Sequence, residues 1–142
     1  MKTGAHTQWE CKYHLILNPK YRKDIFKDQQ IKEYAWNLLN EIAVEYEAEI
    51  EAMEISEEHV HMLIEIPPKI AVSRFIGILK SISGRELFKR FPGIKKRLWA
   101  GEFWKDGYMV KSVGSEITKE SVIRYIAGHK KKAGGPAQLK LE

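Results

Sequence analysis

Two histidines separated by one residue are the part of this sequence best suited to chemistry. His59 and His61 lie in HVHMLIEI (59–66), in which every second residue is apolar, a pattern that predicts a strand. Alternate residues of a strand point to the same face, so the two imidazoles project together, at the spacing needed to bind one metal ion. The alternative is a pair of structural histidines on a half-exposed face.

A second pair of reactive side chains lies near the end of the chain. Tyr125 and His129 are four residues apart in VIRYIAGHKK (122–131), and a helix places such residues one above the other on one face. A tyrosine hydroxyl is a poor nucleophile at neutral pH, and a divalent cation that polarises a phosphate makes its attack easier. In the alternative interpretation Tyr125 is a core residue beside Ile126, and His129 stabilises the C-terminal end of the helix.

The charges of the chain are strongly segregated. The 142 residues carry 24 Lys and Arg against 19 Asp and Glu, a formal net charge of +5. Residues 33–68 contain ten carboxylates and no Lys or Arg, whereas residues 74–97 contain eight bases and a single acid. The eight bases are Arg74, Lys80, Arg85, Lys89, Arg90, Lys95, Lys96 and Arg97. Such a surface predicts a polyanionic partner, with a solvated basic helix that binds nothing as the alternative.

Four aromatic residues follow this basic segment in the sequence: Trp99, Phe103, Trp104 and Tyr108. Exposed rings stack on nucleic acid bases, with about 1–3 kcal/mol for each base. Core packing explains these rings equally well, because alternation along residues 103–110 directs about half of them inward.

The elements that must position these side chains follow from periodicity. Strands are predicted at 12–18, 48–55, 59–66 and 103–113, with a slipped register near the end of 48–55 and a bulge or kink at Gly107. Helices are predicted at 27–48, 71–90 and 118–132, and a turn at 91–97. The order βαββαβα predicts an α+β, ferredoxin-like fold. Two helices then cover one face of a four-stranded antiparallel sheet, and the other face is open for function.

Length and composition favour a single domain over residues 1–142, with flexible ends at 1–9 and 133–142. No stretch approaches the roughly 20 apolar residues of a membrane span, and the N-terminus does not resemble a secretion signal. The single Cys11 cannot form an internal disulfide or a thiolate zinc site. We therefore expect a cytoplasmic protein with no membrane partner.

Five segments together resemble one family. They are YHLILNPKYRK (13–23), EEHVHMLIEIPP (57–68), LKSISGRELFKRFP (79–92), GEFWKDGYMVKSVG (101–114) and VIRYIAGHKK (122–131). In this order, over about residues 10–132, the chain resembles the small single-tyrosine transposases of bacterial and archaeal insertion sequences. These proteins belong to the HUH (His-hydrophobic-His) nuclease superfamily.

The resemblance implies roles for the reactive residues. His59 and His61 match the histidines that hold a divalent metal, usually Mg²⁺ or Mn²⁺, and Tyr125 matches the nucleophile. His129 stands where many relatives carry a Gln that completes the metal site. Several imidazoles favour Mn²⁺ or another transition ion over Mg²⁺, which prefers oxygen ligands.

The resemblance also implies a reaction and its partners. The enzyme cleaves single-stranded DNA through a 5′-phosphotyrosine intermediate and rejoins strands without a nucleotide cofactor. Family members act as homodimers that bind hairpins at the element ends, and we expect the basic residues of 74–97 to bind the hairpin. The connector 111–118 allows the Tyr125 helix to cross to the partner subunit, so that each active site is formed in trans.

Two other functions remain as alternatives at this point. A related HUH nicking enzyme of the replication-initiator or relaxase kind cuts without end hairpins, although this short chain lacks a helicase region. A non-catalytic nucleic-acid-binding module on the same fold normally presents aromatic residues on its central strands. Here the corresponding strand presents His59 and His61, which favours metal chemistry.

Overall fold

The computed structural model describes residues 1–6, 8–20, 24–97, 101–114 and 122–127. Within them, four strands form an antiparallel sheet in the order β4-β5-β3-β6. The strands are β3 (Lys12–Leu17), β4 (Glu49–Ile55), β5 (Val60–Glu65) and β6 (Met109–Val113). β3 and β5 are the central strands, so their side chains lie in the middle of the sheet. The predicted α+β, ferredoxin-like architecture is confirmed.

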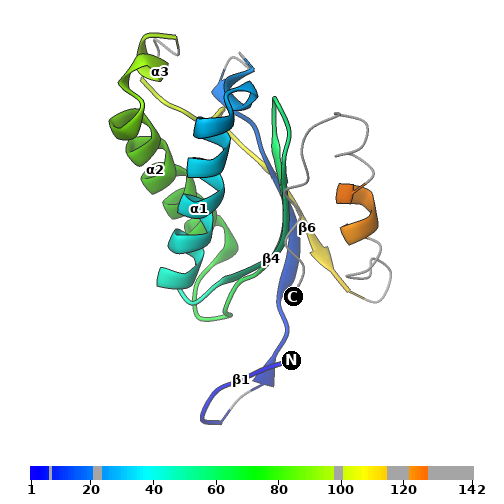
Figure 1. Ribbon diagram of the computed structural model, residues 1–142. Coiled ribbons are helices and arrows are strands. Elements are labelled where there is room, and N and C mark those ends of the chain that lie inside the picture. The colour runs from blue at the N-terminus through cyan, green and yellow to red at the C-terminus, as the bar shows by residue number, and fades with distance from the viewer. Residues whose placement is uncertain (7, 21–23, 98–100, 115–121, 128–142) are drawn as a thin grey trace.

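Two helices, α1 (Gln29–Glu45) and α2 (Val72–Arg90), pack side by side on one face of this sheet (Figure 1). Asp28 caps α1, because its carboxylate accepts hydrogen bonds from the backbone N–H groups of Gln30 and Ile31. Two short helical elements were not predicted: the 3₁₀ turn η2 (Ile25–Lys27) and α3 (Pro92–Arg97), in the segment expected to be a turn.

The main core lies between these helices and the sheet. Val60, Met62 and Ile64 of β5 are fully buried there, as the alternation in the sequence predicts. Leu79 of α2 lies in the same core. A register shift does occur in β4, but it lies between Ile50 and Ala52, near the start of the strand and not near its end as predicted.

The last strand is shorter than predicted. β6 begins at Met109, and Gly107, with a φ of 80°, precedes the strand and does not form a bulge within it. Phe103 and Trp104 pack against α2, where a Cβ atom on Gly84 would lie 3.3 Å from the Cβ of Phe103. Gly84 therefore allows this segment to approach the helix closely, which the sequence pattern could not reveal.

The second face of the sheet is partly covered and not open as expected. Residues 122–127 are helical and lie on the side opposite α1 and α2, in orange in Figure 1. Val122 and Ile126 are buried against Ala52 and Leu63 of the sheet. The rest of the predicted helix 118–132 lies outside the described residues.

The N-terminal residues form a small separate sheet that was not predicted. β1 (Lys2–Thr3) pairs with β2 (Gln8–Trp9) and extends away from the four-stranded sheet (Figure 1). Across the described parts of the chain, the helices are too short or too polar to pass through a bilayer.

Candidate active site

The two histidines of HVH lie side by side at the end of a central strand. His59 immediately precedes β5, and His61 is its second residue. Their ring centroids are 5.3 Å apart, with the rings nearly perpendicular. His61 is only 3% exposed because residues 122–127 cover this face.

The orientation of His59 is set by its neighbours. Ser56 and His59 close the tight β4–β5 turn, in which the Ser56 N–H donates to the His59 carbonyl oxygen at 2.9 Å. On the ring, Nδ1 lies 3.3 Å from Oδ1 of Asn18, the residue that follows β3. Since an amide oxygen only accepts, a hydrogen bond at this contact requires the proton on Nδ1, which leaves the ring lone pair on Nε2. A second residue that fixes the tautomer in this way is typical of metal-binding histidines.

Tyr125 lies over the same region of the sheet. Its helical neighbours Val122 and Ile126 are buried, whereas Tyr125 itself is 54% exposed, which argues against a core role. The centroid of its ring lies 5.9 Å from that of His61. The fold of a single chain thus brings Tyr125 close to His61, although the two residues are far apart in sequence.

A third histidine, His14 of β3, belongs to the same cluster and was missed from the sequence. Its ring centroid lies 5.7 Å from that of His61 and 5.5 Å from that of Tyr125. Burial lowers the pKa of His14, and the positive charge of Lys111 lowers it further. Alternation in β3 places His14 on the opposite face from the core residues Leu15 and Leu17, which the sequence alone could have shown. Its closeness to His61 depends on how the strands pair, which the sequence alone could not show.

A buried carboxylate also lies beside the histidines. Glu54 of β4 is fully buried and pairs directly with His61 in the β4–β5 ladder. Side chains opposite each other in such a ladder have Cβ atoms about 4.5–5.5 Å apart, within contact range. Glu54 is one of the ten carboxylates of residues 33–68, and no role for it was predicted from the sequence.

Another acidic group lies at the opposite end of β5. The carboxylates of Glu49, Glu51 and Glu65 approach within 4.8 Å of one another. Lysines pair with two of them: Lys2 Nζ lies 2.7 Å from Glu49, and Lys12 Nζ lies 3.0 Å from Glu51. The hydrogen bond to Glu49 raises the pKa of Lys2. We assign this cluster to ion pairing.

The histidine pair fits a shared divalent ion. With a metal–nitrogen distance of about 2.1 Å, each ring centre lies about 3.2 Å from the ion. Two such rings are about 4.5 Å apart at a right angle and about 5.2 Å apart at a tetrahedral angle, close to the observed 5.3 Å. Glu54, opposite His61 in the ladder, adds carboxylate oxygens of the kind that bind a cation. His129, the predicted third ligand, lies outside the described residues.

The predicted DNA-binding residues lie on and beside α2. A cleft of about 710 Å³ is formed by α2 and residues 101–106, and Arg85, Lys89 and Lys95 line it. Arg74 and Arg90 are also exposed, and the Arg90 guanidinium lies 4.7 Å from the centre of the Phe91 ring. The side chains of Lys96 and Arg97 are outside what the structure describes.

Lys80 serves the fold itself. Its Nζ donates hydrogen bonds to the carbonyl oxygens of Lys105 and Gly107, both at 2.9 Å. Burial lowers the pKa of Lys80, while Asp106 opposes that shift. Lys80 therefore fastens the segment before β6 to α2.

Core packing accounts for two of the four aromatic residues. Phe103 is 2% exposed, and Trp104 donates from Nε1 to Ser83 Oγ at 2.8 Å in a buried position. Neither ring is exposed for base stacking. Tyr108 is exposed, and Trp99 lies outside the described residues.

The fold and this site define a class of protein. A histidine pair at a central strand of a ferredoxin-like sheet, facing a helical tyrosine, is the arrangement of an HUH single-tyrosine transposase. The family model described as "Transposase IS200 like" matches residues 7–129. The chain belongs to the IS200-like transposase family, and it is an enzyme of that family.

Individual relatives agree with this membership. The transposase for insertion sequence element IS200 of Salmonella typhimurium is 38% identical over 118 residues, covering 83% of this chain and 77% of the relative. The ISDra2 transposase TnpA of Deinococcus radiodurans is 32% identical over 126 residues, covering 89% of both chains.

Solved structures show the same fold. A crystal structure of a protein assigned as a transposase in Deinococcus radiodurans superimposes with a TM-score of 0.74 at 30% identity, covering 90% of this chain and 97% of that one. A REP-associated tyrosine transposase bound to a REP hairpin has a TM-score of 0.63 at 15% identity, covering 93% and 75%; this likeness concerns the fold alone.

Proposed function

We propose that this transposase cleaves and rejoins single-stranded DNA at the ends of an insertion sequence, with Tyr125 as the nucleophile. The observation that carries the proposal is the position of the Tyr125 ring, 5.9 Å from the buried ring of His61 and exposed to an incoming strand. A replication-initiator type of nicking enzyme and a non-catalytic module share the fold, but family membership favours transposition.

The chemistry is a transesterification. The Tyr125 oxygen attacks phosphorus, an O–P bond to tyrosine forms, and the bond to the 3′ oxygen breaks. The tyrosine proton passes to solvent or a nearby base, and the leaving 3′ oxygen takes up a proton. A second 3′ hydroxyl can reverse the reaction on the 5′-phosphotyrosine, so strands are rejoined without ATP.

We assign the metal site to His59 and His61, with His129 as a further ligand. When bound, a divalent ion such as Mn²⁺ or Mg²⁺ supplies positive charge that polarises the phosphate. Asn18 holds the His59 ring in the tautomer that such binding requires. Glu54 lies opposite His61 and offers carboxylate oxygens on the same side of the sheet.

We assign hairpin recognition to the basic surface, defined as Arg74, Lys80, Arg85, Lys89, Arg90, Lys95, Lys96 and Arg97, with Lys80 acting mainly through the fold. The exposure of Arg85, Lys89 and Arg90 on α2 supports the proposal, because exposed cations bind the phosphate backbone. A protein of the same fold, the REP-associated tyrosine transposase, is itself bound to a REP hairpin.

We further propose a homodimer in which Tyr125 of one subunit completes the His59 and His61 site of the other. In the single chain, the described helical residues rest on their own sheet through Val122 and Ile126. A second copy offers the same contact surface at Ala52 and Leu63, so the helix can be exchanged without new chemistry.

The test uses oligonucleotides copied from each strand of the DNA that flanks the gene. With Mn²⁺ or Mg²⁺, the wild-type protein is expected to cleave one strand and form an adduct that survives a denaturing gel. EDTA is expected to abolish both the cleavage and the adduct. Tyr125→Phe forms no adduct, whereas Tyr108→Phe, which removes the hydroxyl of another exposed tyrosine, still does. An adduct with Tyr125→Phe would show that the nucleophile is a different residue.

A further inference from the structure

His14 is the member of the active-site cluster to which neither the sequence motif nor the proposed mechanism gives a role. It lies on β3, next to both rings that the reaction needs: its centroid is 5.5 Å from that of Tyr125 and 5.7 Å from that of His61. It is 7% exposed, so it is already removed from water.

The outer nitrogen of this ring needs a partner. Among the described residues, none forms a hydrogen bond with His14 Nε2, although the atom is buried. Buried polar atoms in proteins are nearly always paired, and exceptions often mark a functional site. Nε2 is the ring nitrogen farther from the backbone, and the ring that carries it lies on the face of the sheet that Tyr125 covers.

The ladder argues against a shared ion as that partner. His61 pairs with Ile16, and His14 lies two residues further along β3, opposite Leu63. His59 lies at the other end, beside Asn18. His14 and Asn18 are four residues apart, about 13 Å along the strand. An ion bound by His59 and His61 is therefore on the far side of His61 from His14.

The substrate phosphate is a partner of the right chemistry and position. For in-line attack, the phosphorus must come within about 3.5 Å of the Tyr125 oxygen while staying close to the cation. A phosphate held between Tyr125 and His61 lies beside the His14 ring, which contacts both of these residues. We propose that His14 binds the scissile phosphate, with Nε2–H donating a hydrogen bond to a non-bridging oxygen. This inference rests on the proposed function, because it takes Tyr125 as the nucleophile.

Two substitutions separate this role from packing. His14→Phe keeps a ring of similar size but removes both nitrogens, whereas His14→Gln places an amide N–H near the position of Nε2. In single-turnover cleavage of the flanking-strand oligonucleotide, His14→Phe is expected to be at least 10-fold slower than wild type, and His14→Gln within about 5-fold. The opposite order, with His14→Phe active and His14→Gln inactive, would show that the ring is needed only for packing.

A binding experiment tests the contact without cleavage. In the Tyr125→Phe background with EDTA, we compare oligonucleotides that carry a normal or a neutral methylphosphonate linkage at the cleavage position. The methylphosphonate is expected to bind several-fold more weakly than the normal linkage, and His14→Phe should remove most of that difference. An unchanged difference in the His14→Phe protein would refute the contact, even if the cleavage reaction itself proceeds through Tyr125.

Metal affinity provides the third readout. Titration of Mn²⁺ into the DNA-free protein should give the same affinity for wild type and His14→Phe, and a weaker one for His61→Ala. A loss of Mn²⁺ affinity in His14→Phe would make His14 a metal ligand and overturn the proposal. If the wild-type protein cleaves neither strand, the proposed function fails. If the wild-type protein cleaves but the methylphosphonate difference is unchanged in His14→Phe, the His14 contact alone is refuted.

Discussion

Ile126 provides a quantitative test of how Tyr125 is positioned. It is fully buried and contributes, with Val122, the apolar side of the helical residues 122–127 that contacts Ala52 and Leu63. Burial of two such side chains supplies roughly 3–6 kcal/mol before the entropy of ordering the helix is subtracted. Ile126→Ala removes about 2–3 kcal/mol of this, at the lower end of the range for core truncations, because the cluster is small.

The loss is comparable to the whole docking free energy, so the docked population should fall steeply. At 1.4 kcal/mol for each factor of ten, the docking equilibrium shifts by about 30- to 140-fold. Amide hydrogens of residues 122–127 should then exchange much faster, and single-turnover cleavage should slow by a similar factor. Hairpin affinity and the melting temperature of the main core should change little, because the main core lies on the other face of the sheet.

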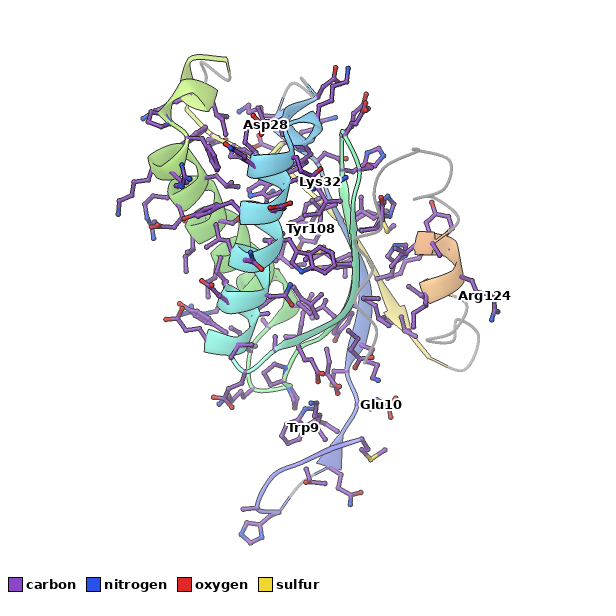
Figure 2. The ribbon with its side chains drawn as sticks, viewed as in Figure 1. Trp9, Glu10, Asp28, Lys32, Tyr108 and Arg124 are labelled. Carbon is purple, nitrogen blue, oxygen red and sulfur yellow. The ribbon has the colours of Figure 1, made fainter. Side chains whose placement is uncertain are left out.

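Two control variants define the result. Arg124 points away from the sheet in Figure 2, so Arg124→Ala should leave amide exchange in this helix unchanged. Leu79→Ala, in the main core, should lower the melting temperature without selective loss of protection at 122–127. The reasoning is refuted if Ile126→Ala lowers the global melting temperature as Leu79→Ala does, yet cleaves at the wild-type rate.

Two further predictions concern DNA binding and subunit arrangement. Hairpin affinity should fall steeply as the salt concentration rises. The double variant Arg85→Ala/Lys89→Ala should reduce the slope of log affinity against log salt concentration by the equivalent of about two phosphate contacts. Lys69→Ala, which removes a distant and exposed charge, should leave this slope unchanged. A slope unchanged in the double variant would place the hairpin elsewhere. Tyr125→Phe and His61→Ala subunits, each inactive alone, should regain cleavage when mixed, because one composite site receives both intact residues. Heterodimers verified with a size tag that stay inactive would establish that Tyr125 acts on its own subunit.

Local patterns were sufficient to predict the elements and the histidine pair. The period of two in β5 separates His61 from Val60 and Met62, and both α1 and α2 follow from the spacing of apolar residues. Each of these properties depends on neighbours within a few positions along the chain, which is why one sequence reveals them.

The features that were missed depend on pairing between distant segments. His14 enters the site because β3 pairs with β5, and Glu54 is buried because β4 brings it opposite His61. The sequence suggests that Trp104 could stack on a base, whereas in the fold it is buried in the core and forms a hydrogen bond with Ser83. The sequence suggests that Lys80 contacts DNA, whereas in the fold its ammonium donates hydrogen bonds to two carbonyl groups before β6. No local spacing encodes these contacts.

The central claim, that Tyr125 forms the covalent bond to DNA, is tested most directly by locating the modified residue. After reaction with the flanking-strand oligonucleotide, the protein is digested with nuclease and protease, and the peptides are analysed by tandem mass spectrometry. We predict a nucleotide linked through its 5′ phosphate to Tyr125, in the peptide that contains residues 122–127. Modification of Tyr108 or another residue, or cleaved DNA with no modified peptide, would contradict the account.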